Sequence, residues 1–162
     1  MPRVRVSIRE GCAIDPDELF LACRDLVPAA FHCEEGEMGK LTPGTIVFEL
    51  VQGIKAPYQG TAVLVEAEAY SYPERDRNVE KRAQSVRLLL SELFPDLSFS
   101  VWLKTVNGGW ASDMSDAGFS GSMSMSTACG RARDNIELYR LKRKANEPDP
   151  LAAVLAAAQQ DT

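Results

Sequence analysis

The residues that most often bind metals or react as nucleophiles are few in this chain. It has one histidine, His32, and four cysteines, no two of which stand in C-x-x-C spacing. A single histidine excludes zinc motifs built on paired histidines, and the cysteine spacing indicates neither a zinc knuckle nor a redox pair. Cys33, Glu34 and Glu35 follow His32 directly. Contiguous ligands rarely bind one ion, so we expect no metal site, and we interpret Cys12 as a structural thiol.

Pro2 offers a different kind of chemistry. If Met1 is removed, the prolyl nitrogen becomes an α-amine, a group whose ordinary pKa is about 7.7–8.0. Apolar surroundings and nearby guanidinium groups both disfavour the charged form, so a neutral amine becomes available as a general base near neutral pH. The other interpretation is that Pro2 only begins a strand, where its missing N–H costs nothing. A retained Met1 would acylate the nitrogen and remove the base.

The overall composition excludes several other classes of protein. A chain of 162 residues with 45% hydrophobic and 25% charged residues is long enough to bury its own core. Its net charge of −5 argues against a protein that coats nucleic acid or anionic lipid, and we interpret the basic run Arg131–Lys144 as a solvated tail. The phosphate-binding motifs G-x-G-x-x-G and G-x-x-x-x-G-K-[ST] do not occur. We therefore expect no nucleic-acid partner and no nucleotide cofactor.

The two ends of the chain indicate where the protein is found. The first nine residues alternate charged and apolar side chains and form no continuous apolar region, so they are not typical of a secretory signal. The apolar stretch Leu151–Ala158 is too short to span a bilayer. With no disulfide pattern either, we expect a cytoplasmic protein with no membrane partner.

The elements that must position Pro2 follow from periodicity. Residues 3–8 alternate like a half-buried strand, and Asp15-Pro16 begins an amphipathic helix that extends to Phe31, with a kink expected near Pro28. Residues 45–52 are predicted to be a second strand. A third strand over 61–70, a helix from Pro73 to before Pro95 and a fourth strand over 98–106 repeat the order.

The order predicts an α+β fold built from two β-α-β units, 3–52 and 61–106. Right-handed crossovers place both helices on one face of a four-stranded mixed sheet, giving an α/β sandwich. The other face then needs a cover, which indicates a homo-oligomer.

The last third of the chain has a different composition. We predict a folded domain over 1–111 and a partly flexible C-terminal extension over 112–162, which is rich in Ser, Gly and Met at its start. Short helices are expected at Asn135–Ala145 and Leu151–Gln160, and the extension is expected to pack on a partner subunit.

These features together resemble the tautomerase superfamily, which includes 4-oxalocrotonate tautomerase, 5-carboxymethyl-2-hydroxymuconate isomerase, macrophage migration inhibitory factor, malonate semialdehyde decarboxylase and the 3-chloroacrylic acid dehalogenases. The resemblance covers roughly residues 2–120 and rests on the Met-Pro start, the two β-α-β units and the Asn-Gly-Gly-Trp turn after the last strand. It is best in VLVEAEAYSYPERDRNVEKRAQSVRLLLSELF and FSVWLKTVNGGWASD.

The resemblance implies the residues of a site. It implies Pro2 as the catalytic base or acid, and arginines before the second helix as ligands of a substrate carboxylate, for which Arg75 and Arg77 are nearest. Trp110 and Phe119 would form apolar walls, whereas Trp102 is interpreted as a packing residue.

The chain also departs from the family pattern. Where 4-oxalocrotonate tautomerase has an arginine after the first strand's glycine, this chain has Gly11-Cys12, and the arginine of the fourth strand falls near Ser100. Arg9 is the candidate substitute. Arg75 and Arg77 also admit a plainer interpretation as a solvated helix face.

The implied function is cofactor-independent proton transfer on a small unsaturated or keto carboxylic acid, performed by a homotrimer. One alternative is a non-catalytic member of the same fold that serves as an oligomeric binding or assembly protein. A second alternative is a dehalogenase, hydratase or decarboxylase of a small acid, although no single carboxylate can be assigned to activate water.

Overall fold

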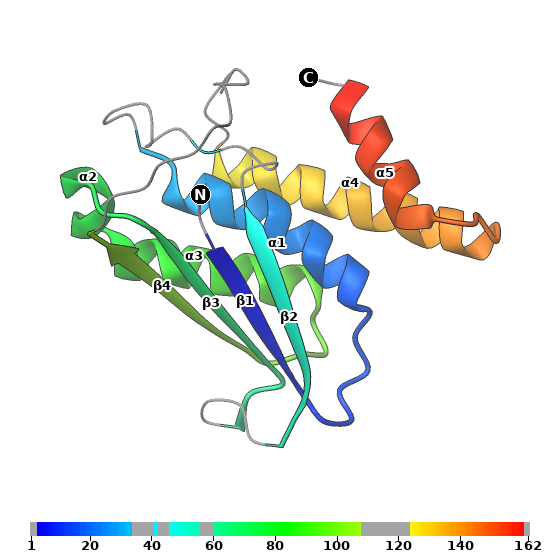
Figure 1. Ribbon diagram of the computed structural model, residues 1–162, viewed down its shortest axis with the longest axis horizontal. Helices are drawn as coiled ribbons and strands as arrows, with labels where there is room; N and C mark the ends of the chain where they lie inside the picture. Colours follow the sequence, from blue (N-terminus) through cyan, green and yellow to red (C-terminus); the bar gives the residue numbers. More distant parts are fainter. Residues whose placement is uncertain (1–2, 34–40, 42–45, 56–59, 108–123, 161–162) are drawn as a thin grey trace.

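Four strands form one mixed sheet in this protein (Figure 1). The computed structural model describes residues 3–33, 41, 46–55, 60–107 and 124–160. The strands are β1 (Arg3–Arg9), β2 (Val47–Ile54), β3 (Val63–Tyr70) and β4 (Phe99–Val106), in the order β2-β1-β3-β4. β1 is parallel to β2, β3 is parallel to β4, and β1 and β3 are antiparallel at the centre. The predicted four-stranded mixed sheet is confirmed.

Helix α1 (Pro16–Phe31) lies between the sheet and another helix. It begins as predicted, because the Asp15 carboxylate accepts a hydrogen bond from the backbone N–H of Asp17 and Pro16 fills the first turn. Phe20 packs edge-on against Phe48 of β2, with ring centroids 5.1 Å apart. Most residues of α1 are buried, so the helix must have neighbours on more than one side.

The second predicted helix is two helices in the structure. α2 (Pro73–Arg77) ends at Asn78, whose φ of −127° is not helical, and α3 (Val79–Leu93) starts directly after it. Asn78 is a poor helix former, and its N–H bonds to the carbonyl of Arg75 instead of continuing the helical ladder. α2 is therefore a separate short helix that carries Arg75 and Arg77.

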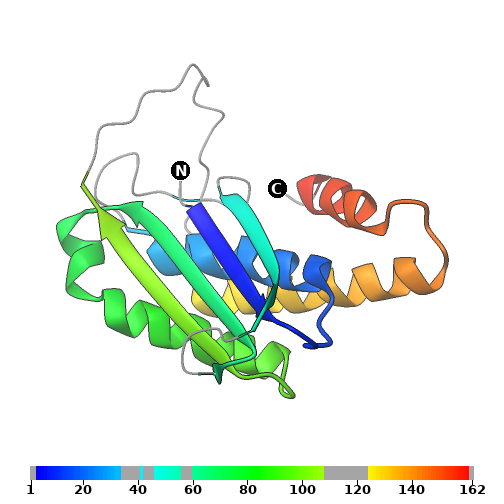
Figure 2. The same cartoon turned by 60° about the horizontal axis from the view of Figure 1, so that its bottom comes forward.

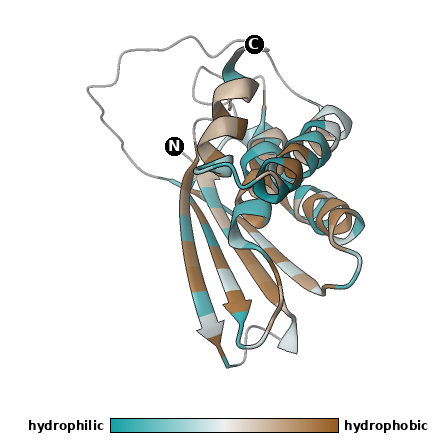
Figure 3. Cartoon of the chain, turned by 90° about the vertical axis from the view of Figure 1, so that its right-hand side faces the viewer, coloured by the Kyte–Doolittle hydropathy of each residue, from teal (hydrophilic) through white to brown (hydrophobic). Residues whose placement is uncertain are grey.

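The helices cover one face of the sheet and leave the other bare among the described residues (Figure 3). On β1, Val4, Val6 and Ile8 are buried on the helix side, while Arg3 and Arg5 point to the other side. We call the uncovered side the open face. The open-face residues on the four strands are Arg3, Arg5, Ser7, Val47, Glu49, Val51, Leu64, Glu66, Glu68, Tyr70, Ser100, Trp102, Lys104 and Val106.

The C-terminal region adds two helices, of which the sequence indicated the second almost at full length and the first only in part. Helix α4 (Met125–Lys144) lies along α1, and α5 (Pro150–Gln160) packs on α4 (Figure 2). We expected an extension over 112–162 packed on a partner subunit, with its first helix starting at Asn135. α4 instead starts ten residues earlier and packs on α1 of its own chain, so the core extends beyond residue 111.

The early start of α4 has a simple cause. Its buried residues Ala128, Ala132, Ile136 and Tyr139 recur every three or four positions, as one helix face requires. Two of them are alanines, which give a weak hydrophobic signal in a sequence but let two helices approach closely. Among the described helices, none is both long and apolar enough to cross a membrane.

Candidate functional site

The expected site lies where β1 begins. Arg3, the first described residue, pairs with Glu68 near the end of β3, and α2 starts three residues after Tyr70. The start of β1, the ends of β3 and β4, and α2 lie at the same end of the sheet (Figure 1). We call this the N-terminal end of the sheet. Pro2, Trp110 and Phe119, which the sequence assigned to the site, lie outside the described residues.

Arg75 lies at this end of the sheet but is fully buried. Its Nε donates a hydrogen bond to the carbonyl of Phe31 at 2.6 Å, and its Nη1 donates to the carbonyl of Tyr70. The guanidinium carbon lies 5.7 Å from the ring centroid of Phe31 and 5.2 Å from that of Tyr72. Burial lowers the pKa of the guanidinium, but arginine stays charged in proteins. Arg75 thus ties the end of α1 to the end of β3.

A second arginine, Arg82 of α3, acts on the same helix end and was missed by the sequence analysis. Its Nη1 donates to the carbonyls of Ala30 and His32 at 2.6 and 2.7 Å, and its Nη2 lies 3.8 Å from a carboxylate oxygen of Glu74. The last turn of α1 contains no basic residue of its own. Two arginines of the second β-α-β unit therefore satisfy the free carbonyls at the end of α1.

Arg77 is the expected site arginine that is exposed at this end. It lies two residues after Arg75, which places it on the opposite side of a helix that turns about 100° per residue. Its Nε donates to the carbonyl of Pro73 at 3.1 Å within the same helix. Since Arg77 is exposed and Arg75 is buried, Arg77 is better placed to meet a small anion.

Arg9 lies at the other end of β1. Six residues at about 3.3 Å each separate it from Arg3, a distance of roughly 20 Å. Its Nη1 donates to the carbonyl of Gly60 at 2.9 Å. Within one chain the structure does not bring Arg9 together with Arg75 and Arg77.

An acidic group, which no motif in the sequence indicates, also lies at the N-terminal end of the sheet. The Ser71 hydroxyl donates to the carboxylate of Asp76 on α2, and Thr105 of β4 contributes a second hydrogen bond. These bonds lower the pKa of Asp76, so the carboxylate stays ionised. The bond from Thr105 could not be foreseen, because it depends on how α2 packs beside β4.

Thiol and metal chemistry find little support in the described residues. Cys33 is buried beside Arg75, and burial raises the pKa of the Cys23 thiol to about 12, which leaves it protonated and inert at neutral pH. The described part of the chain contains no cluster of three or more His, Cys, Asp or Glu able to hold a metal ion.

One prediction about an aromatic residue is wrong. Trp102 was interpreted as a packing residue, but 62% of it is exposed. Its register with Glu66 on β3 and Arg5 on β1 places it on the open face, where no described helix covers it. Alternation along a strand fixes which residues share a face, but it does not say which face the helices cover.

Comparison with known proteins adds no family to this geometry. No protein-family model matches the sequence, and a search of curated proteins finds none that is significantly similar.

Proposed function

We propose that this protein catalyses proton transfer on a small unsaturated or keto carboxylic acid, with the amine of Pro2 as general base and acid. The neutral amine takes a proton from a carbon atom or an enol hydroxyl and returns it to another carbon. The proton is the only group transferred, so the reaction needs no cofactor. Localisation in the cytosol is part of the proposal, since the cysteines Cys12, Cys23, Cys33 and Cys129 are free thiols.

The observation that supports this proposal is the place where β1 begins. Arg3 opens β1 opposite Glu68, and α2 follows the end of β3. Arg3, which follows Pro2 in the sequence, therefore stands at the end of the sheet that presents the exposed Arg77. A guanidinium there would bind a carboxylate and lower the pKa of a neighbouring amine.

The arginines take different roles in this proposal. Arg77 binds the substrate carboxylate, and Arg75 acts as a positioning residue that holds α2 against the end of α1. Arg9 reaches a site only if another copy of the chain brings that end of β1 beside it. A homotrimer in which the open faces of three copies meet would do so, and it would cover Trp102 and Val47, which are 62% and 47% exposed.

The first experiment is an intact mass measurement followed by kinetics. The proposal requires loss of Met1, because retention of Met1 would block the amine. Ketonisation of phenylenolpyruvate or 2-hydroxymuconate should then fall at least about a hundredfold in Pro2→Ala, the range typical of general acid–base catalysis. Arg77→Ala should raise KM, whereas Arg87→Ala, an exposed arginine on α3, should change neither constant.

The alternative from another class is a binding or assembly protein without catalysis. It is favoured by the use of Arg75 in internal hydrogen bonds and by the distance of Arg9 from the other arginines. Retained Met1, or equal rates for the wild type and Pro2→Ala, would overturn the enzymatic proposal in favour of this alternative.

A further inference from the structure

Strand β4 forms one outer edge of the sheet, and its one strand partner in the described chain is β3. The carbonyls of Ser98 and Val106 accept hydrogen bonds from residues at the two ends of β3. The backbone groups of alternate residues point to opposite sides of a strand. Val101, Leu103 and Thr105 therefore direct their N–H and C=O groups away from β3, toward the edge.

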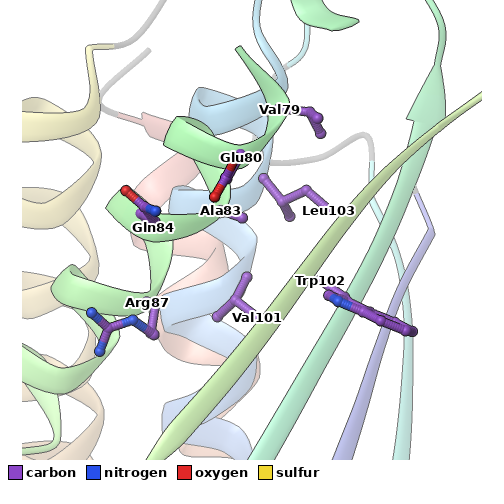
Figure 4. Close-up of a pocket in the computed structure, with 8 residues that line it drawn as sticks. All are labelled: Val79, Glu80, Ala83, Gln84, Arg87, Val101, Trp102 and Leu103. Atoms are coloured by element: carbon purple, nitrogen blue, oxygen red, sulfur yellow. The ribbon is translucent and has the colours of Figure 1, made fainter.

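The two faces of β4 differ in character (Figure 4). Val101 and Leu103 point toward α3, where a recess of about 360 Å³ is also lined by Val79 and Ala83. Trp102 points the other way. A second recess of about 360 Å³ on the open face is lined by Trp102, Lys104 and their β3 neighbours. An added strand would place its side chains alternately into these two recesses.

We propose that β4 pairs antiparallel with β4 of a second copy of this chain, across a two-fold axis at Leu103. The two sheets would then be continuous. Antiparallel addition of a strand uses the outward backbone groups of Val101, Leu103 and Thr105 as hydrogen-bonded pairs. Long exposed edges are a liability in folded proteins, and closed pairing of identical edges removes it.

The charges of the open face favour this register. With Leu103 opposite its own copy, Trp102 lies opposite Lys104 of the second copy in a non-hydrogen-bonded pair, the kind whose side chains approach most closely. An ammonium beside an indole ring is a favourable contact. A shift of the axis to Lys104 would instead place the two lysines against each other.

The row of side chains across the junction continues the complementarity. Glu66 of β3 is the register partner of Arg5 on one side and of Trp102 on the other. The Nζ of Lys104 lies 3.3 Å from the Oε1 of Glu68. At the junction this row meets its counterpart end to end. It runs from Arg5 through Glu66 to Trp102 in one copy, and continues through Lys104 and Glu68 to Arg3 in the second copy. Each charge in this row already has an opposite neighbour within its own chain, so the junction brings no two like charges together.

Two substitutions at one position test the partner. Trp102→Lys faces Lys104 of the second copy and should weaken association at least about tenfold, although the new lysine is attracted to Glu66 in its own chain. Trp102→Glu faces the same lysine and should keep the association, although the new glutamate is repelled by Glu66. Analytical ultracentrifugation of the full chain measures association, and urea unfolding measures stability separately.

A cysteine scan tests the register. Leu103→Cys should cross-link to its own copy under mild oxidation, because the two Cα atoms of a hydrogen-bonded pair lie about 5.5 Å apart. Val101→Cys should not, since it faces Thr105 of the second copy, and the wild type with its four native cysteines is the background control.

The outcomes separate this inference from the proposed enzymatic function. An even-numbered particle that Trp102→Lys dissociates, with cross-linking at Leu103→Cys, supports it. A monomer at every concentration, a trimer that does not pair further into a hexamer, equal association of Trp102→Lys and Trp102→Glu, or cross-linking at Val101→Cys instead of Leu103→Cys overturns it. Retention of Met1 or inactivity toward enol acids affects the enzymatic proposal and leaves this one intact.

Discussion

Two arginines of one short helix have opposite roles in this protein. Arg75 is buried and donates to the carbonyls of Phe31 and Tyr70, while Arg77 is exposed two residues later. The sequence PERDR presents them as equivalent, since both lie at the start of the same predicted helix. Their difference comes from the helix itself, since two positions along α2 turn the side chain by about 200°. The sequence thus predicts arginines at the start of this helix, but it does not indicate which of the two is buried.

Arg75→Ala is expected to destabilise the fold by about 2 to 4 kcal/mol, because two buried carbonyls lose their donor and each costs about 1–3 kcal/mol. Urea denaturation measures the change. Arg77→Ala is the matched control, and a change within about 0.5 kcal/mol is expected there. Similar losses in both variants would contradict the structural role given to Arg75.

Asp25 of α1 has a buried carboxyl group at the contact between α1 and α4. It is fully buried, and its Oδ2 accepts a hydrogen bond from the Nδ2 of Asn135 on α4 at 3.0 Å. Burial raises the pKa of this carboxyl, and the charges of Arg24 and Arg131 oppose the shift only in part. The protonated form is therefore favoured in the folded protein relative to the unfolded chain.

The consequence is a pH dependence with a defined sign. Because the folded-state pKa of Asp25 is raised, its protonated carboxyl contributes fully to the free energy of unfolding below the ordinary aspartate pKa of about 3.9. This contribution is lost as the pH rises through the folded-state pKa. Asp25→Asn, which needs no proton to stay neutral, should remove this decline. Its free energy of unfolding relative to the wild type should therefore increase from pH 4 to pH 7 in urea titrations. Asp134→Asn, an exposed position on α4, should show no such increase.

At the scale of elements, the contact between α1 and α4 joins residues more than a hundred positions apart. The Tyr139 hydroxyl donates to the carboxylate of Asp17 at 2.8 Å, and the Arg140 guanidinium binds Glu18 through two hydrogen bonds. Small residues allow this close approach, since Ala128 and Ala132 are both fully buried. Composition alone suggested a solvated tail here, because the basic residues outnumber the apolar ones that face α1.

Ala132→Leu should therefore destabilise the protein by about 1 to 3 kcal/mol, because a larger side chain must displace α4 from α1. Thermal unfolding followed by circular dichroism measures the loss. Glu137→Leu places the same side chain on the exposed side of α4 and should have little effect. A neutral Ala132→Leu would show that α4 does not pack tightly on α1.

Across the whole molecule, the sequence predicts the strands of the central sheet better than the outer helices or the candidate site. The strands follow from alternation because one face of each is apolar, and Val4, Val6, Val63 and Val65 indeed meet the helices. The helix layer could not be completed from the sequence, since alanine and glycine give α4 no strong periodic signal. The candidate site was harder still, because its geometry depends on contacts between α1, α2 and β3 that join distant parts of the chain.

The central position of β1 also affects the order in which the strands can pair during synthesis. β1 is synthesised before the other described strands, but its antiparallel partner β3 follows about 60 residues later, which is about 3 to 12 seconds at the usual rate of translation. During that interval β1 can pair with β2 alone, and its inner edge stays open to any other strand. A chain interrupted before Tyr70 would keep that edge open permanently, so truncated products of this protein should aggregate far more readily than the complete fold.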